Sequence, residues 1–148
     1  MSPTLIIRHW IATSPEEVWR AYTTPEILYQ FFAPEGLSIP LDSVVIEPWV
    51  GGRFECTMVF DDTGVENPNI GVLEVVEPPH TLAGGEPSLG FRSTQTFTEE
   101  AGGTLITVEQ EGLPAEVIGN PEVVAAFRSS FRKLGRVFGV ETEERACG

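Results

Sequence analysis

The sequence has few basic residues and no long apolar run. Nine lysines and arginines stand against 22 aspartates and glutamates in 148 residues, which gives a formal charge of −13. Nucleic acids and anionic membranes attract basic surfaces, so this balance argues against binding to either. No apolar run approaches the ~18 residues that cross a bilayer, and the N-terminus lacks a basic and apolar signal pattern. We therefore expect a cytoplasmic protein that neither inserts into membranes nor binds nucleic acid.

Cysteine and histidine are also scarce, which limits the chemistry available to the chain. Cys56 lies in a strand pattern and Cys147 near the C-terminal end, and we expect both to be reduced. His9 and His80 are far apart in the sequence, and neither has the spacing of a zinc site. There is no Ser-His-Asp pattern and no phosphate-binding glycine loop. The sequence therefore predicts no catalytic residue, no metal site and no cofactor.

Residues 120–139 carry the pattern of a long C-terminal helix. Asn120 suits the N-cap, Pro121 the first helical position and Gly139 the end. At about 100° per residue the apolar side chains share one stripe. The members of this stripe are Val123, Phe127, Phe131, Leu134 and Phe138. Ser130 projects into the same stripe, where a buried hydroxyl requires a partner or a cavity.

The same helix carries four of the nine bases, and we expect them to form a solvated face. They are Arg128, Arg132, Lys133 and Arg136. A run of charge along a helix is typical of a solvent-exposed side. The alternative is that they dock to an acidic partner or to a second copy of this acidic chain. The oligomeric state is therefore compatible with either a monomer or a homodimer.

The rest of the chain reads mainly as strands. A first strand at Leu5–Ala12 precedes a helix that begins at Pro15, and a second short helix begins at Pro25. Alternating patterns predict later strands at Val44–Trp49, Arg53–Phe60, Gly71–Glu77, Phe91–Thr98 and Thr104–Glu111. Residues 36–40 read as a loop and residues 61–69 as a polar turn region. Residues 82–89 contain two glycines and a proline, so any strand there should be short or broken.

This order predicts an α+β protein with a single domain over residues 1–148. Consecutive antiparallel strands joined by short turns form a curved sheet with one covered face. Three phenylalanines on one helical stripe need a large apolar partner, which the sheet supplies. The terminal helix is the only expected element large enough to cover that sheet.

Three short motifs occur in order along the chain. The first is Ser14–Glu26, which reads S-P-E-E-V-W-R-A-Y-T-T-P-E; the second is the V-G-G-R-F of Val50–Phe54. The third is Gly103–Val108, followed by the E-G-L-P of Glu111–Pro114. In this order, and with the apolar pattern of the last helix, the motifs resemble the heat-shock protein 90 ATPase activator homologue family. That family belongs to the START/polyketide-cyclase (SRPBCC) superfamily.

The resemblance implies a helix-grip fold. In this fold a curved antiparallel sheet of about six or seven strands wraps a long C-terminal helix, and two short helices follow the first strand. A hydrophobic cavity lies between the sheet and the helix. The chain departs from the family in two places, because Ala126-Phe127 stand where a Gly-Trp pair is frequent and Leu82–Gly85 replace an aromatic-rich strand. The second departure would either enlarge the cavity or shorten the strand.

Strand alternation places polar side chains on the inward face of the sheet. If Phe97 and Val108 point inward, then Ser93, Gln95 and Gln110 do so too. Together with the helix hydroxyl named above, they would converge inside an apolar wall, either to bind a ligand or to form an internal network with trapped water. The candidate ligand-binding residues are Phe32, Phe54, Cys56, Met58, Ser93, Gln95, Phe97, Gln110, Phe127, Ser130, Phe131 and Leu134.

Three functions are compatible with this pattern. The first is binding of a small hydrophobic or amphipathic molecule, such as a lipid, by a protein that is not a catalyst. The second is a cyclase- or hydrolase-type enzyme that uses the same cavity, which the absence of an evident general base disfavours. The third is a co-chaperone-like interaction module, suggested only by the family resemblance. A cavity without titratable groups would favour the first, and a flat exposed apolar patch the third.

Overall fold

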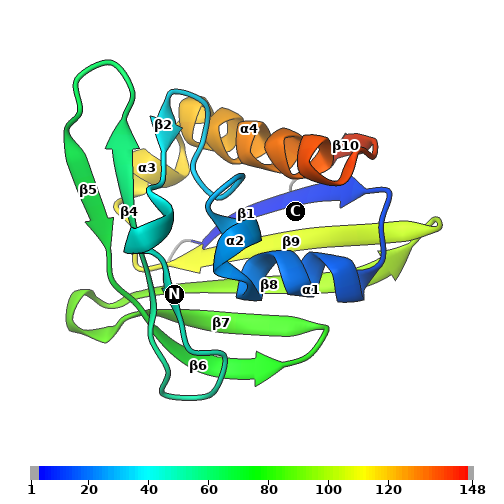
Figure 1. The fold of residues 1–148 in the computed structure, drawn as a ribbon, viewed down its shortest axis with the longest axis horizontal. Coiled ribbons are helices and arrows are strands. Elements are labelled where there is room, and N and C mark those ends of the chain that lie inside the picture. Colours follow the sequence, from blue (N-terminus) through cyan, green and yellow to red (C-terminus); the bar gives the residue numbers. More distant parts are fainter. Residues whose placement is uncertain (1–3, 147–148) are drawn as a thin grey trace.

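The structure, a computed structural model, describes residues 4–146 and contains two antiparallel sheets and four α-helices (Figure 1). The larger sheet has the order β10-β1-β9-β8-β7-β6. Its strands are β1 (Thr4–Ile11), β6 (Val72–Glu77), β7 (Thr81–Glu86), β8 (Phe91–Glu100), β9 (Gly103–Glu111) and β10 (Thr142–Arg145). The smaller sheet comprises β2 (Leu37–Ser38), β3 (Val45–Ile46), β4 (Phe54–Phe60) and β5 (Glu66–Asn69). The helices are α1 (Pro15–Thr23), α2 (Pro25–Leu28), α3 (Ala115–Ile118) and α4 (Pro121–Phe138).

The α+β helix-grip fold expected from the sequence is confirmed, and its helix boundaries follow local chemistry. The Ser14 hydroxyl accepts a hydrogen bond from Glu17 N at the start of α1, and the Asn120 side chain accepts one from Glu122 N at the start of α4. Gly139 ends α4 in the left-handed conformation, with φ 67°, which glycine adopts without strain. None of the helices among residues 4–146 is long and apolar enough to cross a membrane.

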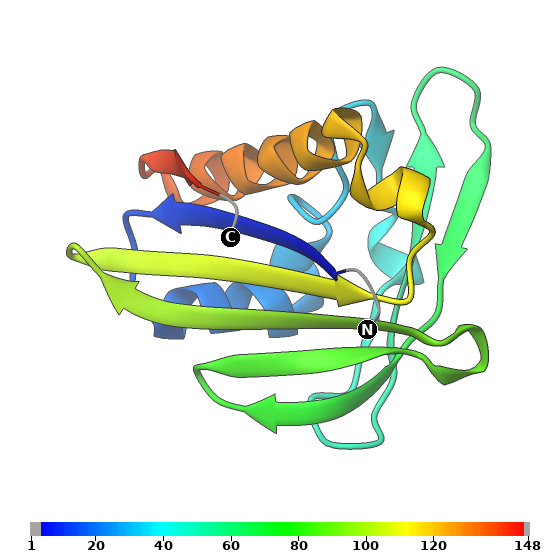
Figure 2. The same cartoon turned by 180° about the vertical axis from the view of Figure 1, so that it is seen from behind.

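The helices cover one face of the larger sheet. Seen from behind, the strands lie in front of α1 and α2 (Figure 2). α4 runs along β1 and β10, whereas α1 lies over β8 and β9. The expectation that the terminal helix alone covers the sheet is therefore wrong. Val18, Tyr22, Leu28 and Phe31 from the first two helices belong to the same buried core as Phe131.

The two sheets meet where β4 begins. Phe54 N donates to Gly71 O at 2.9 Å and Leu73 N donates to Gly52 O at 2.8 Å. From this junction the β4–β5 hairpin projects beside α3, as both views show (Figures 1 and 2). The hairpin and the larger sheet thus form two walls that diverge from a common base.

Several strands differ from the sequence-based expectation. β7 is a continuous strand of six residues, because a side chain at Gly84 or Gly85 would collide with the backbone of β6 or β8. A Cβ at Gly84 would lie 2.4 Å from Val72 O, so the glycine permits close strand approach rather than breaking the strand. β2 and β5 replace an expected loop and turn region, and β3 covers only part of Val44–Trp49. α3 and β10 are short and carry no apolar periodicity that would reveal them.

Arg128 is buried, so the expectation of a solvated basic face on α4 is wrong for this residue. Only 7% of Arg128 is exposed. Its guanidinium donates to Arg8 O in β1 and, at 2.8 Å, to Arg145 O in β10, and it lies 3.4 Å from the carboxylate of Glu144. Arg128 therefore ties α4 to two neighbouring strands, while Arg132 and Arg136 are exposed as expected.

His9 packs beneath α4, next to Arg128. Its ring stacks on Phe131 at 5.0 Å between centroids, and its Nδ1 lies 3.0 Å from Nη1 of Arg128. Because a guanidinium can only donate, Nδ1 accepts and the neutral ring carries its proton on Nε2. Burial, with the charges of Arg128, Arg132 and Arg145, lowers the pKa of His9 to about 4. His9 is thus a neutral core residue near pH 7.

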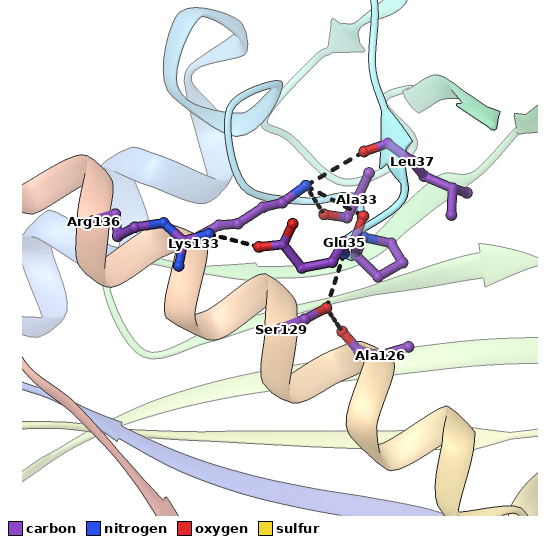
Figure 3. Close-up of polar contacts among 8 residues, drawn as sticks. Ala33, Glu35, Leu37, Ala126, Ser129, Lys133 and Arg136 are labelled. Atoms are coloured by element: carbon purple, nitrogen blue, oxygen red, sulfur yellow. Dashed lines mark hydrogen bonds and ion pairs between the residues drawn. The ribbon is translucent and has the colours of Figure 1, made fainter. Parts of the chain in front are cut away.

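A second side of α4 holds the segment between α2 and β2 (Figure 3). Lys133 Nζ donates to three backbone oxygens, those of Ala33 and Pro34 in this segment and of Leu37 at the start of β2, at 3.0, 3.2 and 3.3 Å. The Ser129 hydroxyl accepts from Glu35 N at 3.0 Å. Lys133 is therefore also an exception to the expected solvated face, since its ammonium group donates to backbone oxygens rather than to solvent alone.

We expect His9 to make the stability of the fold depend on pH. Above its unfolded pKa of about 6.5, both states are neutral; below it, the unfolded chain binds a proton that the folded protein does not bind until about pH 4. Stability is therefore lost as the pH falls through this window. Relative to a His9→Gln variant, the wild type should lose about 2 kcal/mol of unfolding free energy between pH 7 and pH 5. Urea denaturation at the two pH values measures this, and an unchanged gap between the two proteins would contradict it.

We expect Lys133→Met to destabilise the protein by about 1–3 kcal/mol, because partly buried carbonyl groups lose their donor. Arg132→Met is a matched control, since it removes the same charge from the preceding residue, which is exposed, and should change stability by less than about 0.5 kcal/mol. Equal effects in urea denaturation at pH 7 would show that the contacts of Lys133 contribute nothing beyond charge.

Candidate functional site

A pocket of about 370 Å³ lies where α4, the larger sheet and the β4–β5 hairpin meet. From α4 it is lined by Ala126, Phe127, Ser130 and Phe131. The larger sheet contributes Val72, Leu73, Leu82, Gly84, Gly85, Glu86, Phe91, Ser93, Gln95, Val108 and Gln110. The remaining wall comes from Tyr22, Phe31, Phe32, Pro34, Phe54, Cys56, Met58, Asn69, Ile70, Gly71 and Leu113. Most of these side chains are apolar.

Most of the candidate residues from the sequence line this pocket. They are Phe32, Phe54, Cys56, Met58, Ser93, Gln95, Gln110, Phe127, Ser130 and Phe131. The structure instead places Phe97 and Leu134 in the packed core, both with 0% exposure. Phe97 lies two residues beyond Gln95 on β8, where α1 covers the strand and Tyr22 contacts its ring at 5.1 Å. Strand alternation therefore predicts the inward face of β8 correctly, but not the point along the strand where the pocket ends and the packed core begins.

The pocket contains a polar trio, which comprises Ser93, Gln95 and Gln110. Ser93 and Gln110 are direct partners across β8 and β9, and Gln95 lies two residues further along the same face. The Ser93 hydroxyl oxygen accepts from Gln95 Nε2 at 2.5 Å and from Gln110 Nε2 at 3.2 Å. Ser130 does not join the trio, because its hydroxyl is placed to donate to Phe32 O at 3.4 Å. Three of the four expected polar groups are therefore assembled.

Three titratable side chains line the pocket, Tyr22, Cys56 and Glu86, and only Cys56 is among the candidates predicted from the sequence. Burial raises the pKa of the Cys56 thiol to about 11 and raises that of the Tyr22 hydroxyl well above its usual range. Glu86 lies at the end of β7, within the stretch expected to be broken. The apolar side of α1 was the signal for Tyr22, whereas nothing in the pattern pointed to Glu86. His9 lies behind Phe131 and does not line the pocket.

Within residues 4–146, no three histidine, cysteine, aspartate or glutamate side chains are grouped so as to hold a metal ion. Cys147 lies outside the described residues.

Solved structures with the same fold come from several bacteria. A protein from Rhodobacter sphaeroides superposes with a TM-score of 0.79 at 22% identity, over 92% of each chain. A protein from Nitrosomonas europaea has a TM-score of 0.79 at 20% identity, over 92% of this chain and 94% of that one. An AHSA1-like protein from Aeromonas hydrophila has a TM-score of 0.75 at 21% identity, over 97% of this chain and 99% of that one. At such identities the likeness shows the fold alone.

A comparison with curated proteins finds no match. The family resemblance noted in the sequence is nevertheless confirmed, because the family model described as "Activator of Hsp90 ATPase homolog 1-like protein" matches residues 12–139. This span contains both early helices, every strand that lines the pocket and all of α4. The chain therefore belongs to the Activator of Hsp90 ATPase homolog 1-like family, within the SRPBCC superfamily.

Proposed function

We propose that this protein binds a small, mostly apolar molecule in the pocket between α4 and the larger sheet. The observation that carries the proposal is a polar trio within a mostly apolar pocket. A volume of about 370 Å³ falls within the range of small-molecule sites. Such sites combine apolar walls, which supply affinity, with a few polar groups, which orient the ligand. The same proposal covers lipid-like ligands whose apolar part fits this volume.

The alternative of a purely structural polar network explains less of the arrangement. Ser93 accepts two hydrogen bonds, but each glutamine keeps a side-chain oxygen and one N–H beyond these bonds. These groups lie among residues that line the pocket, rather than in the packed core with Phe97. The unused hydrogen-bonding capacity therefore faces a space that a ligand can occupy.

The enzyme alternative requires a group that exchanges protons near neutral pH. The raised pKa values keep the Cys56 thiol and the Tyr22 hydroxyl protonated at that pH, so neither is a ready nucleophile or base. His9 is separated from the pocket by Phe131. Glu86 is then the one titratable lining group left to act as a base, and an enzyme would not account for the polar trio as binding does.

A co-chaperone role would need an apolar docking face. Among residues 4–146 the exposed Trp49, Val50 and Val72 lie near the junction of the two sheets, but nothing identifies a partner for them. We therefore favour binding over the other two functions.

Filling the pocket tests the proposal directly. Ala126 lines the pocket, and the neighbouring Ala125 is exposed on the same helix. We expect Ala126→Phe to weaken binding of the neutral fluorescent dye prodan at least tenfold, because the added ring occupies pocket volume. Ala125→Phe should leave the affinity unchanged. Equal affinities of the two variants in a fluorescence titration would place the dye elsewhere and count against the proposal.

Removing the polar trio tests whether it serves a ligand or the fold. In the triple variant Ser93→Ala, Gln95→Leu, Gln110→Leu, all partners of the network disappear together, which can be nearly neutral for folding. We expect the melting temperature to stay the same or rise. The affinity for prodan, which carries a carbonyl acceptor, should fall about fivefold, as expected for one lost hydrogen bond of about 1 kcal/mol. A large fall in melting temperature with unchanged dye affinity would support the structural network instead.

A further inference from the structure

The charges around the pocket carry information about its ligand. All nine lysines and arginines lie within residues 4–146, and none of them lines the pocket. On α4, Lys133 donates to carbonyls of the segment between α2 and β2 and of β2 itself, and Arg128 donates to β1 and β10. Arg92 follows the pocket-lining Phe91 on β8, and strand alternation directs it to the opposite face from Ser93. A ligand anion would therefore find no cationic partner in the pocket.

The one carboxylate in the pocket lining further disfavours an anionic ligand. Glu86 would repel a carboxylate or phosphate in the pocket, and the net charge of −13 acts in the same direction. Burying an anion without a counter-charge is strongly unfavourable in an apolar site. An anionic head group could avoid this only by staying in water, which would also keep it away from the polar trio.

The polar trio offers hydrogen bonds that suit an uncharged group. Ser93 accepts from both glutamines, so the side-chain oxygens of Gln95 and Gln110 stay open as acceptors and their second N–H groups as donors. An uncharged hydroxyl or amide both donates and accepts, and can use both kinds of group at once. A carboxylate can only accept and would leave the amide oxygens unmatched.

From this combination we infer that the pocket selects an apolar molecule with an uncharged hydroxyl- or amide-type head and discriminates against carboxylates and phosphates. This inference rests on the proposed function, because it specifies the ligand of the same pocket. It excludes ionised fatty acids and phospholipid head groups as occupants of the polar trio.

Displacement of prodan by chain-matched competitors at pH 8 tests the inference. Decan-1-ol and decanoate each contain ten carbons, and decanoate is ionised at this pH. Its apolar chain is one carbon shorter, which accounts for about fourfold in affinity. We expect decan-1-ol to displace the dye at a concentration at least tenfold lower than decanoate does. In Glu86→Gln, which removes the carboxylate and keeps the shape, the preference should shrink. In the triple variant of the trio, the affinity for decan-1-ol should fall.

The outcomes separate the two proposals. Equal or tighter binding of decanoate in the wild type would overturn the ligand class while leaving a ligand-binding pocket. Displacement that is unaffected by Ala126→Phe would overturn the proposed function itself, because the competitors would then bind outside the pocket. An alcohol preference that persists undiminished in both Glu86→Gln and the triple variant would also overturn the inference, since neither charge nor the trio would then cause it.

Discussion

A guanidinium that is removed from water requires fixed acceptors for its donors, and this requirement decides where α4 can lie. Arg128 meets it with backbone oxygens of β1 and β10, together with Nδ1 of His9. Because these acceptors belong to strands of the same sheet, the helix is held at one place along β1. The stacking of His9 on Phe131 then fixes the rotation of the helix, which directs Phe127 and Phe131 to the pocket.

The opposite side of α4 is held by different chemistry. Lys133 and Ser129 bind the backbone of the segment between α2 and β2, which also supplies Pro34 to the pocket wall. The helix is thus tied to the sheet on one side and to this segment on the other. The pocket is the space left between two anchored walls, so its shape depends on hydrogen bonds outside it as well as on the side chains that line it.

Elements with a local signal in the sequence, such as a helix cap or an alternating pattern, could be predicted from it. The caps at Ser14 and Asn120 and the apolar stripe of α4 predicted both helices, and strand alternation placed Ser93, Gln95 and Gln110 on one face. The sequence could not reveal how far the packed core extends along β8 or along α4, so it predicts Phe97 and Leu134 in the pocket rather than in the core. Nor could a helical wheel show that β10 pairs with β1 beside α4 and that Arg128 is buried there. Such features depend on contacts between residues distant in the sequence, as does the continuous β7, where glycines allow the neighbouring backbones to approach.

The two outer strands of the larger sheet, β10 and β6, bear on how the protein behaves at high concentration. An outer strand presents unpaired backbone groups that can recruit a strand from another molecule and begin aggregation. Here both carry exposed carboxylates, Glu143 and Glu144 on β10 and Glu74 and Glu77 on β6. Like charges meeting across two such strands repel each other. The excess of acidic residues, which disfavours nucleic-acid binding, thus also disfavours strand pairing between molecules. Because β10 pairs with β1, the apolar residues of β1 do not lie on an outer strand.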